Sequence, residues 1–172
     1  MKKIIALMLA LAAVVAVLAA CSGGEGEKET EKVKDSQKTV ETEAAKQTDP
    51  QAIADALVAA GDFEAKIEQT SEDNAKYEFF GLPEGTKAVV YMSTAVSDQV
   101  AVFKTSDTEA VKGIVETYVS NRVETLENYQ PEQAKKLEDN AAIVASGDLV
   151  VLLVSKASSL EAKELIEKTI NG

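Results

Sequence analysis

The chain has 172 residues, with 29 acidic and 18 basic side chains and a formal net charge of −11. This length accommodates one domain of ordinary size once a targeting segment is set aside, and the acidic balance argues against binding to nucleic-acid phosphates. The sequence has no histidine and a single cysteine, so it excludes an intramolecular disulfide and Ser-His or Cys-His catalysis, and it disfavours zinc sites.

The N-terminus has the parts of an export signal. Two lysines follow Met1, an apolar run extends from Ile4 to Ala20, and Cys21 comes directly after two alanines. The run is short for a membrane span, which needs about 20 apolar residues, and the pattern is typical of a cleaved signal. The segment resembles the lipobox of bacterial lipoproteins. This resemblance implies that residues 1–20 are removed and that a diacylglycerol on Cys21 anchors the chain to the outer face of the cytoplasmic membrane.

A polar segment follows the cysteine. Residues 21–49 are rich in Glu, Lys and Thr, and they contain too few apolar side chains to offset the entropy of ordering, so we expect a disordered tether. A single domain is predicted over residues 50–172. Asp49 before Pro50 predicts a helix with an N-cap, and Gly61 is its predicted end. Residues 62–71 have no clear pattern, and a second short helix is expected from about 72 to 80.

From residue 87 the pattern of strands and helices is clearer. Strands are predicted at 87–94 and 99–104 with a turn at 95–98, then a helix to about residue 128 that opens with the capping box of Ser106 and Glu109. A short helix at 131–137 is followed by strands at 141–145 and 149–155. The last helix opens with a second capping box, formed by Ser158 and Glu161.

The domain therefore contains a ββα unit twice. Val102 aligns without a gap with Val154, and Ile114 with Ile166; duplication and a shared need for helix caps explain this equally well. We predict an α+β fold, in which a four-stranded antiparallel sheet from two ββα units packs against helices and is preceded by N-terminal helices. Because the strands are apolar on both faces, we expect the N-terminal helices, a protein partner or a second copy to cover the second face.

Several short patterns are weak signals for chemistry. The segment Gly81-Leu-Pro-Glu-Gly85-Thr-Lys87 is loosely similar to a phosphate loop, but its spacing differs, and we interpret it as a turn from helix to strand. Ser155 and Lys156 are neighbours on a strand, where adjacent side chains point to opposite faces and do not pair. Some glutamates fall on helical faces that are expected to be solvated: Glu124, Glu127, Glu161, Glu164 and Glu167.

The aromatic side chains in the domain are expected to be core residues rather than a binding platform. The residues concerned are Tyr77, Phe79, Phe80, Tyr91 and Phe103.

Four segments of the domain carry a resemblance to a known family. They are Tyr91-Met-Ser-Thr94, Gln99-Val-Ala-Val-Phe-Lys104, Tyr129-Gln-Pro-Glu132 and the run from Ile143 to Ser155. Over about residues 50–170 the chain resembles bacterial lipoproteins of the domain of unknown function 4358 family. The resemblance implies a lipid-anchored, extracytoplasmic domain, and it transfers no activity and no functional residue.

The residues thus predict no catalytic, cofactor-binding or metal-binding site, and Cys21 is the predicted site of lipidation. We expect a non-catalytic binding or interaction module at the cell surface. The alternatives are a carboxylate- or metal-dependent hydrolase and a small solute-binding accessory to a transporter.

Overall fold

The computed structural model describes residues 48–172, so the predicted signal peptide, Cys21 and the tether up to residue 47 lie outside the described residues. The described elements are α2 (Pro50–Ala60), β1 (Glu68–Gln69), α3 (Glu72–Glu78), β2 (Lys87–Met92), β3 (Gln99–Lys104), α4 (Thr108–Glu127), α5 (Pro131–Asn140), β4 (Ala142–Ser146), β5 (Leu149–Val154) and α6 (Ser159–Asn171). No helix among them is long and apolar enough to cross a membrane.

The sheet of this mixed α/β fold is antiparallel and has the order β1-β2-β3-β5-β4. Four of its strands are those predicted, and the prediction of four strands in all is wrong by one. The additional strand, β1, pairs Gln69 with Tyr91 of β2. It is only two residues long, which is too short for a period of two to be recognised.

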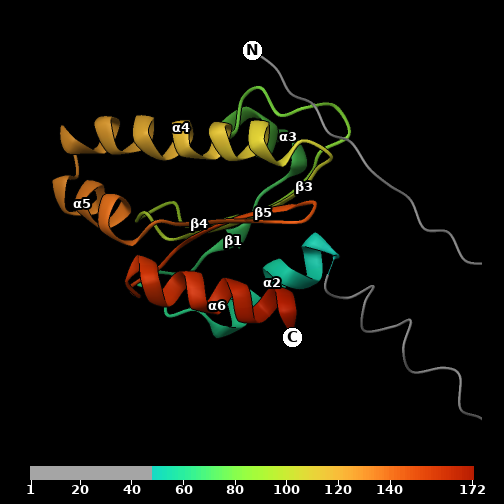
Figure 1. Cartoon of the computed structure of the whole chain (residues 1–172). Coiled ribbons are helices and arrows are strands. Elements are labelled where there is room, and N and C mark those ends of the chain that lie inside the picture. The colour runs from blue at the N-terminus through green and yellow to red at the C-terminus, as the bar shows by residue number, and fades with distance from the viewer. Residues whose placement is uncertain (1–47) are drawn as a thin grey trace, which may run out of the picture. The chain divides into compact units, whose positions relative to one another are not determined.

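Helices cover both faces of the sheet (Figure 1). On one face, α2 and α6 pack against alternate residues of β3 and β5, such as Val102 and Val151. On the other face, α3, α4 and α5 pack against the intervening residues, such as Phe103 and Leu152. Every residue of β5 is buried. The apolar pattern on both faces of the strands is therefore explained by helices of the chain itself.

Local sequence determines where the helices begin and end. The Asp49 side chain accepts a hydrogen bond from the Gln51 N–H and caps α2 as predicted. The predicted capping box of Ser158 and Glu161 is present at the start of α6. The one predicted at Ser106 is absent, because α4 begins one residue later and the carboxylate of Asp107 accepts the hydrogen bond from Ala110 N–H.

The aromatic residues do not all lie in the core. Phe79 and Phe103 are fully buried with an edge-to-face contact, whereas Tyr77 and Phe80 of the same segment are 82% and 87% exposed. The prediction of core positions is therefore wrong for Tyr77 and Phe80. Since α3 is only seven residues long, its inward face accommodates few side chains, and these two aromatic residues point away from it.

The two ββα units are not related by a rotation. Because β3 and β5 are antiparallel neighbours, a two-fold axis perpendicular to the sheet would superpose the two hairpins and leave each face of the sheet in place. However, α4 and α6 cover opposite faces (Figure 1). The aligned residues Val102 and Val154 accordingly belong to opposite cores. The similarity between the two halves of the sequence therefore does not correspond to a symmetric repeat.

Candidate functional site

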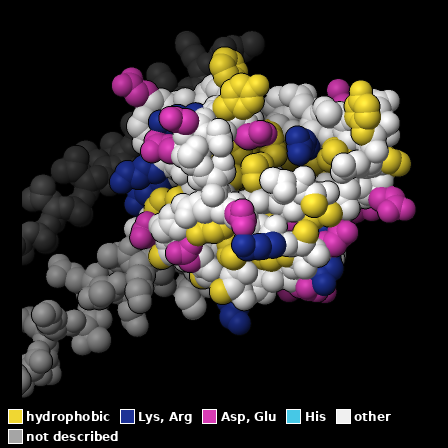
Figure 2. Space-filling model, turned by 180° about the vertical axis from the view of Figure 1, so that it is seen from behind, with side chains coloured by type: hydrophobic (Ala, Val, Ile, Leu, Met, Phe, Trp, Pro, Cys, Tyr) yellow, Lys and Arg dark blue, Asp and Glu magenta, His cyan; other side chains and the backbone are white. Residues whose placement is uncertain are grey.

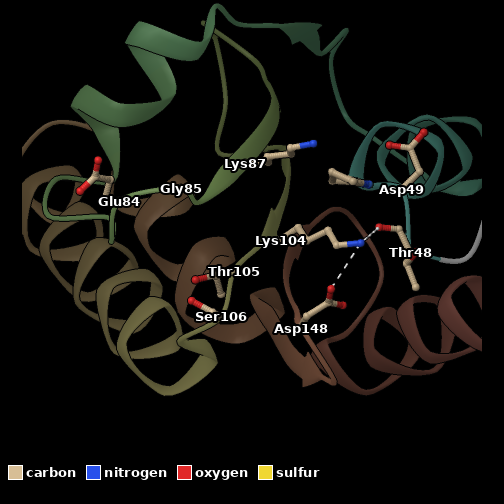
Figure 3. Close-up of a pocket in the computed structure, with 10 residues that line it drawn as sticks. Thr48, Asp49, Glu84, Gly85, Lys87, Lys104, Thr105, Ser106 and Asp148 are labelled. Carbon is tan, nitrogen blue, oxygen red and sulfur yellow. Dashed lines mark hydrogen bonds and ion pairs between the residues drawn. The ribbon is translucent and has the colours of Figure 1, made fainter. Parts of the chain in front are cut away.

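A cleft of about 590 Å³ lies at the end of the sheet where β2 begins and β3 ends (Figure 3). The first residues of α2, the turn before β2, the residues after β3 and the turn between β4 and β5 complete its walls. The lining residues are Thr48, Asp49, Pro50, Glu84, Gly85, Lys87, Lys104, Thr105, Ser106 and Asp148. The cleft is thus formed by segments that are distant in the sequence and converge at one edge of the fold.

Two lysines stand side by side in this cleft. Lys87 and Lys104 are directly opposite each other on β2 and β3, so their side chains leave the same face of the sheet, and opposed like charges destabilise a strand pair. The Lys104 ammonium lies 3.3 Å from the Asp148 carboxylate and donates to the Thr48 carbonyl at 3.1 Å. Lys87 forms no ion pair within the described part of the chain.

A carboxylate borders the cleft on the side of α2. Asp49 caps this helix through one oxygen, at 3.1 Å from the Gln51 nitrogen, and no described residue donates to its other oxygen. Figure 3 shows Asp49 on the side toward which the Lys87 side chain extends. The two groups do not form an ion pair, although both line the cleft. An open cation and a largely open anion are therefore available to a ligand.

The floor of the cleft is held by hydrogen bonds. Thr86 and Thr105 are both buried and their hydroxyl oxygens lie 3.2 Å apart. The Thr105 hydroxyl also accepts from the Asp107 N–H at 3.1 Å, and its own N–H donates to the Asp148 carbonyl at 2.8 Å. These contacts join the start of β2, the end of β3 and the β4–β5 turn, so the cleft has a preorganised base.

Another polar cluster joins the 62–67 segment, the β2–β3 turn and α5. The Asp98 carboxylate is completely buried, and it accepts hydrogen bonds from Lys136 at 2.5 Å and from the N–H groups of Glu64 and Ala65. Lys136 also hydrogen-bonds Glu64 at 2.9 Å, which lowers the pKa of that carboxyl below its usual value. All partners of Asp98 are provided by the chain itself, so this cluster is a structural link between elements.

A third polar pair lies under α4. Tyr118 donates to Gln99 at 2.9 Å, and burial raises the pKa of the phenol above its usual value. The Gln99 amide nitrogen is buried without a partner in the described structure, and the cavity beside it has a volume of only about 10 Å³. This volume is that of one water molecule, so the cavity is too small for a larger ligand.

The residues that the sequence analysis considered for catalysis or metal binding lie apart from the cleft, with one exception. The Ser155 hydroxyl accepts from the Ala157 N–H, and Lys156 pairs with Asp62 at 2.6 Å, so the two side chains have different partners as predicted. The glutamates of α4 and α6 are exposed, and no three potential metal-ligating side chains of residues 48–172 converge.

The exception is the segment from Gly81 to Lys87. It forms the predicted turn, with positive φ at Gly81 and Gly85, and Gly85 and Lys87 line the cleft. Sequence reasoning missed the cleft because its charged groups come from four segments that are separated in the sequence. The single lysine at one end of β2 and of β3 is the signal that could have indicated it.

The fold and the cleft together define a small three-layer mixed α/β domain with a charged cleft at one end of its sheet. Residues 59–155 match the family described as Domain of unknown function (DUF4358). The match spans more than half of the chain, so the chain belongs to this family, as its sequence motifs indicate. No curated protein and no solved structure gives a significant match.

Proposed function

We propose that this chain is a lipid-anchored, extracytoplasmic binding module without catalytic activity, and that its ligand binds in the cleft of Lys87 and Lys104. The unpaired ammonium of Lys87 is the observation that carries the proposal. In this acidic chain, basic and acidic side chains are interspersed over the face shown in Figure 2, whereas Lys87 is paired across the strands with a second lysine rather than with an acid. Lys104 already pairs with Asp148, so an anionic group of a ligand would neutralise the positive charge that remains, which is that of Lys87.

The surroundings of Lys87 favour binding over chemistry. A nucleophile needs a neighbouring base to activate it, and the Thr105 hydroxyl of the cleft is instead hydrogen-bonded to Thr86 and to the Asp107 N–H. A floor fixed in this way lowers the entropic cost of binding. The cleft is also within the usual size range of small-molecule sites, about 300–1,000 Å³.

The lipid anchor is proposed from Cys21 and the preceding apolar run. Thr48, the first residue that the structure describes, lines the cleft, so a tether from the membrane reaches the domain beside the proposed site. Cys21→Ser should abolish labelling with palmitate and partitioning into the detergent phase, because serine cannot form the thioether. A mutant that labels and partitions like the wild type would refute the anchor.

Ligand binding can be tested with the full chain in a neutral detergent. We expect a panel of small charged metabolites to include compounds that raise the melting temperature, since a ligand that binds only the folded state stabilises it. Lys87→Gln should weaken their binding about tenfold, equivalent to ~1.4 kcal/mol. Lys163→Gln is the matched control, because Lys163 is an exposed lysine of α6 outside the cleft. Equal affinities in all three proteins would contradict the assignment of the site.

A further inference from the structure

We infer that the ligand of the cleft is a small zwitterion, whose anionic group binds Lys87 and whose ammonium group binds Asp49. This inference rests on the proposed function, because it names the chemical class that the proposed site accepts. It follows from the way in which the charges of the cleft are already paired, or left unpaired, in the described structure.

The charges of the cleft form one satisfied pair and one open pair. Lys104 and Asp148 neutralise each other at 3.3 Å, and Lys104 is held further by the Thr48 carbonyl. Lys87 has no carboxylate partner, and Asp49 has no cationic partner, within residues 48–172. They line the same cleft and do not pair with each other. A molecule with both charges can bridge them, and a water molecule cannot neutralise either.

A ligand with a single charge meets repulsion in this cleft. An anion attracted to the two lysines also meets three lining carboxylates, those of Asp49, Glu84 and Asp148. A cation attracted to these carboxylates meets the unpaired Lys87. A cleft residue with the same charge as a ligand repels it, so the mixed charges of this cleft disfavour ligands with a single charge. Glu84 lies on the far side of the cleft from Asp49 (Figure 3), so the Lys87–Asp49 side is the balanced one.

Two sources supply this chemistry. Free amino acids and short peptides carry a carboxylate and an ammonium, and the headgroup of phosphatidylethanolamine carries a phosphate and an ammonium. The shared feature is one anionic and one ammonium group a few bonds apart. The probes are therefore alanine and O-phosphoethanolamine, with acetate and inorganic phosphate as matched anions and ethylamine as the matched cation.

Calorimetric titration of the full chain in neutral detergent tests the inference. We expect each zwitterion to bind at least about tenfold more tightly than its single-charge analogues. Asp49→Asn should weaken zwitterion binding about fivefold or more and leave phosphate or acetate binding equal or stronger. Asparagine caps a helix as well as aspartate does, so this variant removes the charge and keeps α2. Lys87→Gln should weaken binding of zwitterions and anions alike.

The outcomes separate this inference from the proposed function. If phosphate binds as tightly as O-phosphoethanolamine and Asp49→Asn changes neither affinity, the cleft is an anion site. In that case the inference of a zwitterionic ligand is refuted and the proposed function holds. If no zwitterion binds, the inference is also refuted. If no ligand of any class depends on Lys87, the proposed function fails as well.

The source of the zwitterion is tested in nanodiscs with and without phosphatidylethanolamine. Weaker apparent binding of O-phosphoethanolamine in discs that contain this lipid supports the zwitterion with the headgroup as its source. Unchanged binding supports a soluble zwitterion.

Discussion

At the scale of single residues, the ion pair between Asp98 and Lys136 is buried and joins the β2–β3 connection to α5. The Asp98 side chain has no exposed surface, and the Lys136 side chain is 12% exposed. A buried carboxylate without its counter-ion is costly, even where the pair as a whole contributes little net stability. Replacing Lys136 should therefore destabilise the fold more than replacing a lysine on the surface.

We predict that Lys136→Met lowers the free energy of unfolding by about 3 kcal/mol, because it leaves the Asp98 carboxylate buried and unpaired. Urea denaturation of the full chain measures this change. Lys135→Met is the matched control, since the neighbouring Lys135 forms an exposed ion pair with Asp139, and such pairs contribute about 0–1 kcal/mol. Similar losses in the two variants would show that Asp98 does not depend on Lys136.

At the scale of elements, Gly113 is unusual in the interior of the long helix α4. A Cβ atom added there would meet no atom within 4 Å, so packing in the described structure does not require a glycine. Glycine in a helix costs about 1 kcal/mol relative to alanine. Gly113 lines an open groove of about 510 Å³, which the exposed side chain of Phe80 also lines.

We predict that Gly113→Ala raises the free energy of unfolding by about 0.5–1 kcal/mol, through the loss of backbone freedom in the unfolded chain. Thermal and urea unfolding measure the gain. Gly61→Ala is the contrasting variant, because its Cβ would lie 2.6 Å from the ring of Phe63, and it should be destabilising. Destabilisation by Gly113→Ala would mean that α4 packs more closely at this point than described.

Helices and strands with strong local signals could be predicted from the sequence. The register between the strands β2 and β3 could not. The cap at Asp49 and the capping box at Ser158 are present because a few neighbouring residues are sufficient for them. A turn at 95–98 would pair Thr94 with Gln99. In the structure the connection is longer, the Ser93 N–H bonds the Asp98 carbonyl, and Met92 pairs with Gln99.

This difference of two residues explains why the candidate site was not predictable. The observed register places Lys87 opposite Lys104, whereas the predicted turn would have placed Val89 there. Asp98 determines the connection through contacts with Glu64 and Lys136, which are distant in sequence. Local patterns contain no information on such contacts, so the two lysines of the cleft could not be recognised as neighbours.

At the scale of the whole molecule, α2 completes a layer that the rest of the domain leaves open. Its buried residues Ile53, Ala54 and Leu57 pack in the same core as α6. The sequence correctly indicated that both faces of the sheet are apolar. It could not indicate that α4 and α6 lie on opposite faces, because a capping box starts a helix without determining which face it covers.

We predict that a chain starting at Gly61 binds the dye ANS and loses cooperative unfolding, because without α2 the apolar surface of β3 and α6 is exposed to water. A chain starting at Asp49 retains α2 and is the control, with little dye binding. Dye fluorescence and near-ultraviolet circular dichroism distinguish the two. A native-like spectrum from the shorter chain would show that α2 contributes little to the core.

The central pairing of β3 with β5 also has a consequence for the order of folding. The two strands pair along their whole length, yet α4, α5 and β4 separate them in the sequence. A chain delivered from its N-terminus, by a ribosome or through a translocation channel, presents β3 long before β5. Because β5 is the last strand of the sheet in chain order and lies between β3 and β4, the sheet cannot close until the other four strands have emerged. The central pairing of the sheet therefore forms late, after the helices that cover β3 have already been made.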